Sequence, residues 1–78
     1  MTPLSLAPTG EPMTIVDVLG GRGLRHRLND MGLVPGTVVE VLQSLGHGPV
    51  ILAVGDSRLV LGRGVSHKVL VEPASDRT

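Results

Sequence analysis

The chain has 78 residues with seven basic and seven acidic side chains, no cysteine and no aromatic residue of the Phe, Tyr or Trp type. The lack of cysteine excludes disulfides and thiolate metal sites, and the balanced charge gives no overall field that would attract nucleic acid or an anionic membrane. The longest apolar run, Val50–Val54, is far shorter than the roughly 20 residues of a bilayer span, and no secretion signal opens the chain. We therefore expect one soluble, cytoplasmic domain with an aliphatic core.

Residues 1–12 contain three prolines, and this content predicts a mostly irregular lead-in. A single helical turn is expected at residues 3–7. We expect Leu4 and Leu6 to attach this lead-in to the body of the domain.

Short stretches rich in aliphatic residues predict five strands, at residues 13–19, 37–45, Val50–Val54, 58–61 and 67–72. In the first of them, Ile15 and Asp17 should face one side and Val16 and Val18 the other. Glycine-containing turns join the later strands, and the polar residues 73–78 are expected to form a disordered tail. Five closely spaced strands favour a mainly β fold, a small closed barrel or a strongly bent sheet, in a domain of residues 13–72.

One short helix is predicted between the first two strands. Leu24, Leu28 and Met31 recur at i, i+4 and i+7, so they share one face and should belong to the core. Arg25, His26 and Asn29 should point away from that face, and a helix of this length needs an apolar surface to lie on.

The end of this helix is marked by two glycines. Gly32 stands where a left-handed residue closes a helix, and Leu33 can fold back onto the last turn. Pro35 and Gly36 suit the two central positions of a type II turn into the next strand.

Three histidines raise the question of a metal site. His26 and Asp30 lie at i, i+4 and supply at most two ligands, so a site would need a distant carboxylate such as Glu72. An exposed ion pair between His26 and Asp30 is the simpler interpretation, and His47 and His67 suit solvated positions. We expect no cofactor, and a divalent ion bridging two chains in a crystal would be adventitious.

The chain shows no motif of an enzyme. Its serines lack the context of a nucleophile elbow, and no paired carboxylates suggest acid–base catalysis. The glycine-rich residues 20–23 precede the helix but match neither the dinucleotide fingerprint nor the P-loop, so they indicate a flexible connection.

A cluster of polar residues on the helix is the candidate partner-binding surface. It comprises Arg22, Arg25, His26, Arg27 and Asn29. Binding to nucleic acid is not expected, because there are no aromatic side chains for stacking and no net positive charge. An acidic patch on another protein would suit these arginines better.

The run R-x-R-L-x-x-M-G-L-x-P-G, from Arg25 to Gly36, resembles the FeoA family of ferrous iron transport proteins. The run G-P-V-I-L-A-V from Gly48 resembles a strand of the same family. This resemblance implies an SH3-like β-barrel of about five strands with one short inserted helix. It also implies a non-enzymatic cytoplasmic accessory of bacterial ferrous iron uptake, which binds the permease FeoB and its GTP-hydrolysing domain and is recruited by it to the inner face of the membrane without inserting.

Two features leave alternatives open. Family members usually have a short helix after the fourth strand, where this chain has glycines in residues 62–66 and a turn is expected. The same barrel occurs as the C-terminal module of iron-dependent repressors, so the alternative function is a metal-responsive sensor of iron or another divalent cation, with His26, Asp30 and Glu72 as ligands. Self-association into a homo-oligomer is also left open.

Overall fold

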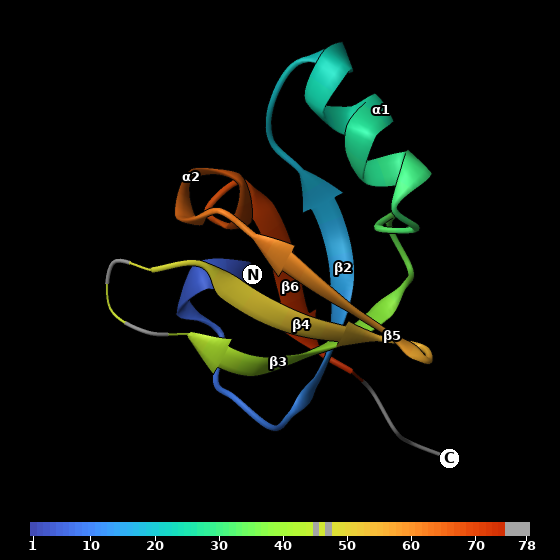
Figure 1. Ribbon diagram of the computed structural model, residues 1–78. Helices are drawn as coiled ribbons and strands as arrows, with labels where there is room; N and C mark the ends of the chain where they lie inside the picture. The colour runs from blue at the N-terminus through green and yellow to red at the C-terminus, as the bar shows by residue number, and fades with distance from the viewer. Residues whose placement is uncertain (45, 47, 75–78) are drawn as a thin grey trace.

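The fold is a single strongly bent antiparallel sheet with one helix standing on it (Figure 1). The computed structural model describes residues 1–44, 46 and 48–74, and within these the strands run in the order β1-β6-β2-β3-β4-β5. The strands are β1 (Thr2–Pro3), β2 (Pro12–Val18), β3 (Val38–Ser44), β4 (Val50–Val54), β5 (Ser57–Leu61) and β6 (Val69–Pro73). The helices are the 3-10 turn η1 (Leu4–Leu6), α1 (Arg22–Asp30) and α2 (Arg63–Ser66). The predicted mainly β class with one inserted helix is confirmed.

The core lies on the concave side of the sheet and is built from aliphatic side chains at alternate strand positions. Val39 and Val41 of β3, Leu52 of β4, and Val69 and Val71 of β6 are all at most 1% exposed. Each such side chain contributes about 1.5–3 kcal/mol to folding through its removal from water. Small β-branched residues dominate because a tightly bent sheet encloses little volume.

A β-bulge in β2 changes which side chains face the core. Ile15 pairs with Val71 but Asp17 pairs with Leu70, so one extra residue, Val16, is accommodated on β2. Ile15 is therefore buried while Asp17 turns outward. The expectation that Ile15 and Asp17 share a face is wrong, because an alternating pattern cannot reveal an inserted residue.

The first residues are more ordered than an irregular lead-in. Thr2 and Pro3 pair with Val71 and Leu70 of β6, so β1 is a short strand at one end of the sheet. Proline is tolerated there because an edge strand needs fewer donors. The expected helical turn forms as η1.

The two leucines of the lead-in differ. Leu4 is fully buried, as expected, whereas Leu6 is 66% exposed, so its predicted contact with the body is wrong. In a 3-10 turn, residues two apart lie on different sides, so both leucines cannot face the core.

The region after β5 forms a helical turn where an irregular turn is expected. In α2, the Ser66 N–H donates to the Gly62 carbonyl over 2.9 Å, and the His67 N–H donates to the Arg63 carbonyl over 3.0 Å. These bonds delay the start of the last strand to Val69. Pro73 belongs to that strand instead of the tail, and the predictions for Leu45, His47 and residues 75–78 lie outside the described residues.

Candidate functional site

Helix α1 is the most prominent feature outside the sheet, and its end has the geometry that its sequence predicts. Gly32 has a φ of 85°. Its N–H donates to the Asn29 carbonyl over 2.9 Å, and the Leu33 N–H donates to the Leu28 carbonyl over 2.8 Å. These two hydrogen bonds form the Schellman motif, which satisfies the last carbonyls of the helix and reverses the direction of the chain. The turn that follows also forms as predicted, with Gly36 at a φ of 97°.

The helix is anchored through few apolar side chains. Leu28 and Leu33 are each 1% exposed, and Leu24 packs against the core while remaining partly exposed. Met31, predicted to be core, is 37% exposed. It is the C-cap residue, and the reversal at Gly32 sends Leu33 into the core in its place.

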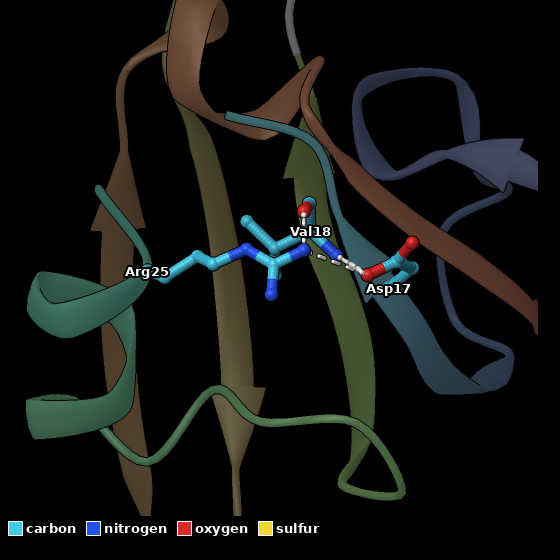
Figure 2. A network of polar contacts seen from close by, with 3 residues as sticks. All are labelled: Asp17, Val18 and Arg25. Atoms are coloured by element: carbon cyan, nitrogen blue, oxygen red, sulfur yellow. Dashed lines mark hydrogen bonds and ion pairs between the residues drawn. The ribbon is translucent and has the colours of Figure 1, made fainter. Parts of the chain in front are cut away.

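The side chain of Arg25 connects α1 to the end of β2 through polar contacts (Figure 2). Its Nη2 donates to the Val18 carbonyl over 3.1 Å and lies 3.4 Å from Oδ1 of Asp17. The same Oδ1 accepts the Val18 N–H over 2.8 Å. The expectation that Arg25 points away from the body is therefore wrong: the bulge turns Asp17 outward, and the arginine reaches back to it. Both side chains are about half exposed, so the ion pair itself contributes at most ~1 kcal/mol.

Two hollows flank α1. The one toward β2 has a volume of about 240 Å³ and is lined by Asp17, Val18, Arg25, Asn29, Leu33 and Pro35. The other has a volume of about 110 Å³ and separates α1 from β5 and α2; its lining is Leu24, Arg27, Leu28, Met31, Val60, Leu61, Gly62 and Val65. Three of the six residues that line the first hollow are polar, whereas those that line the second are apolar apart from Arg27 and Gly62; this second hollow is called the aliphatic hollow below.

The structure divides the predicted partner-binding residues among these places. Arg25 and Asn29 line the hollow toward β2, and Arg27 lines the aliphatic hollow. Arg22 and His26 line neither hollow and are exposed on the outer side of the helix. The five residues therefore lie on one helix but border different hollows or none.

The structure does not assemble a metal site from the candidate ligands. No group of three or more His, Asp or Glu side chains is placed to hold an ion within residues 1–44, 46 and 48–74, so His26, Asp30 and Glu72 do not converge. The ion pair expected between His26 and Asp30 does not form either, and the ion pair of the described residues is Arg25 with Asp17.

One polar contact has no counterpart in the sequence analysis. The Oγ of Ser5, a buried residue of η1, lies 3.1 Å from Nδ1 of His67 at the end of α2. His67 is exposed, as predicted, but it also forms a hydrogen bond that links the first residues of the chain to the segment before β6. Because the two residues are 62 apart in residue number, no local pattern could have indicated the contact.

Residues 2–73 match the FeoA domain family. The chain belongs to the FeoA family. It is 35% identical over 74 residues to Fe(2+) transport protein A of Methanocaldococcus jannaschii, which spans 95% of this chain and 89% of that protein. A crystal structure of the iron uptake regulatory protein FeoA superposes with a TM-score of 0.87 at 38% identity, over 94% of this chain and 97% of that one. The FeoA chain is therefore a ferrous iron transport accessory protein.

Two further structures bear on the fold. The zinc complex of FeoA from Stenotrophomonas maltophilia, described as a prokaryotic SH3-domain protein, has a TM-score of 0.75 at 26% identity over 88% of this chain and 87% of that one. This confirms the SH3-like class. A manganese-dependent transcriptional repressor has a TM-score of 0.83 at 15% identity over 92% of this chain and 41% of that one, which shows a shared fold alone. Among the described residues, no helix is long and apolar enough to cross a bilayer.

Proposed function

We propose that this FeoA protein is a cytoplasmic accessory of ferrous iron uptake that docks, through the outer side of α1, onto the cytosolic GTP-hydrolysing domain of the permease FeoB. The family assignment supports the role in ferrous iron transport. The exposed side of α1 supports the mode of action, because it carries Arg22 and His26 free of the two hollows.

The observation that carries this proposal is the poor electrostatic fit of Arg22 to its own helix. Arg22 is the first residue of α1, it follows Gly21, which offers no capping side chain, and the first turn contains no acidic residue. The amino end of a helix carries a partial positive charge, which favours Asp or Glu there and disfavours Arg. Helix stability therefore does not account for Arg22, whereas an acidic patch on a partner would.

Arg25 has a different part in the proposal. Its bonds to Val18 and Asp17 hold α1 at a fixed angle to the sheet. A docking helix that is fixed in this way loses less conformational freedom on binding, which favours affinity. Arg25 is therefore a positioning residue, and it is Arg22 and His26 that would touch the partner.

The test is a calorimetric titration of the isolated cytosolic domain of FeoB from the same cell with the full chain and two variants. Arg22→Glu should weaken binding at least tenfold without lowering Tm, because a glutamate suits the first helical turn. Lys68→Glu changes the net charge equally at an exposed position outside α1 and should bind like the unchanged chain. Equal binding by the Arg22→Glu variant would contradict the proposal.

A further inference from the structure

We propose that the aliphatic hollow between β5 and α1 binds an extended segment of a partner protein, which adds to β5 as a further strand. The segment would place one apolar side chain in the hollow and one carboxylate against Arg27. This inference concerns a different surface from the outer side of α1, so it can hold or fail independently of docking to FeoB.

The first support is the free edge of β5. This strand is the last in the sheet and pairs with β4 alone, in a register from Val54 with Ser57 to Val50 with Leu61. Since only Gly55 and Asp56 separate Val54 from Ser57, that pair closes the hairpin and exchanges both hydrogen bonds.

The same alternation decides which main-chain groups of β5 are free. Residues 57, 59 and 61 direct their N–H and C=O groups toward β4. Arg58 and Val60 direct theirs away from the sheet, and no main-chain bond of the described residues satisfies them. An unpaired edge of this kind is a template for another extended chain.

The second support is the surface beside this edge. The C-terminal end of β5 lies with α1 on one side and α2 on the other (Figure 1), and the hollow between them has a volume of about 110 Å³. Met31 and Val60 on its rim are 37% and 62% exposed, and Val65 of α2 is half-buried at its far side. This volume suits one valine- or leucine-sized side chain, and its occupation would remove both exposed residues from water.

The third support is charge. Arg27 is the charged side chain among the residues that line the hollow. Within the described part of the chain, its guanidinium takes part in no hydrogen bond or ion pair. A guanidinium next to an apolar surface pairs well with a carboxylate, in one or two charge-assisted bonds. The segment that complements this site is therefore extended, apolar at one position and acidic near it.

An extended segment fits this site better than a helix does. A helix satisfies its own main chain and would leave the groups of Arg58 and Val60 unpaired beneath it, whereas a strand would satisfy them. The geometry is that of strand addition beside a helix: main-chain bonds to β5 supply the alignment, and the hollow and Arg27 supply the selectivity.

The experiment is an NMR titration of the 15N-labelled full chain with a capped pentapeptide in which valine and threonine alternate and one valine is replaced by glutamate, so that the glutamate and the remaining valines share one face. Amide hydrogen exchange at Arg58 and Val60 should slow at least tenfold on saturation, while Leu59, already bonded to β4, should change little. A peptide N-methylated on the amides that face β5 should not bind, and one methylated on the other amides should.

Two variants sharpen the test. Val60→Pro removes an outward donor without removing a bond to β4, and should weaken binding about tenfold. Arg27→Glu should reverse the preference from the glutamate peptide to its lysine counterpart. Because Arg27 lies in the last turn of α1, where the helix dipole favours a cation, Tm should fall slightly, and binding is compared well below both Tm values.

Three outcomes would overturn the proposal. Unchanged exchange at Arg58 and Val60 at saturating peptide would exclude strand addition, as would equal binding by the two N-methylated peptides. If these amides are protected in the absence of peptide, and the protection increases with protein concentration, the β5 edge pairs with a second copy of the chain instead.

Discussion

The sheet is stabilised by many buried side chains and strand pairings, whereas helix α1 is held by only a few contacts. Every central strand contributes side chains with at most 1% exposure to the core, and pairs with a neighbour on each side. Helix α1 contributes Leu28 fully and Leu24 partly, and depends for its orientation on the glycine reversal at its end and on Arg25. The comparison teaches that the sheet determines the fold. The helix is an attached element, and its outer side stays exposed to solvent and accessible to a partner.

The largest expected effect separates the two regions directly. Leu52→Ala in β4 removes a fully buried side chain from the centre of the core and should cost about 2–5 kcal/mol of unfolding free energy in urea denaturation. Leu24→Ala, at a helix position that is already partly exposed, should cost clearly less. A loss at Leu24 as large as that at Leu52 would show that α1 is as integral to the fold as the strands.

The glycine reversal should be the most sensitive point of the helix attachment. Gly32→Val forces a β-branched residue into a φ of 85° and should cost about 1–2 kcal/mol, although a Cβ there meets no atom within 4 Å. Gly23→Ala, inside the helix with equally open space around it, should raise stability by about 0.5–1 kcal/mol. The opposite signs, read from paired urea titrations, isolate backbone conformation from packing.

The Arg25 contacts should have a smaller and more local effect. Arg25→Ala removes the bond to the Val18 carbonyl and the pair with Asp17, and we expect a loss of about 1 kcal/mol, or about 4–8 °C in Tm. Amide exchange should speed up across α1 and stay unchanged in β4. An unaltered Tm with unaltered exchange in α1 would show that the leucines alone orient the helix.

The smallest effect is expected at Arg22 and has the opposite direction. Arg22→Glu should raise the unfolding free energy by about 0.3–1 kcal/mol at low ionic strength, and added salt should reduce this gain. Thermal unfolding at two salt concentrations measures it. A decrease in stability would mean that Arg22 has a structural partner.

Much of the fold followed from the sequence because the deciding signals are local. The reversal at Gly32, the turn at Gly36 and the alternating valines of β3 and β4 each depend on residues within a few positions of one another. The family resemblance at residues 25–36 added the SH3-like class, which the comparisons confirm.

The features that were missed depend on residues far apart in the chain. The bulge at Val16 is set by how β2 matches β6, and β1 exists because Thr2 meets Val71. Arg25 was assigned to the outer side of the helix by periodicity, which cannot show that the bulge brings Asp17 within its reach. The two hollows likewise arise from how elements pack. The sequence could therefore place the candidate surface on α1, but it could not show which of its residues line each hollow.

The most direct test of the central claim, that α1 is presented for docking, is a chemical-shift map of the 15N-labelled chain with unlabelled cytosolic domain of FeoB. The account predicts that the largest shifts and line broadening cluster at Arg22, His26 and their neighbours on the outer side of α1. Perturbations confined to β3 and the start of the chain, or none at saturating partner, would contradict it.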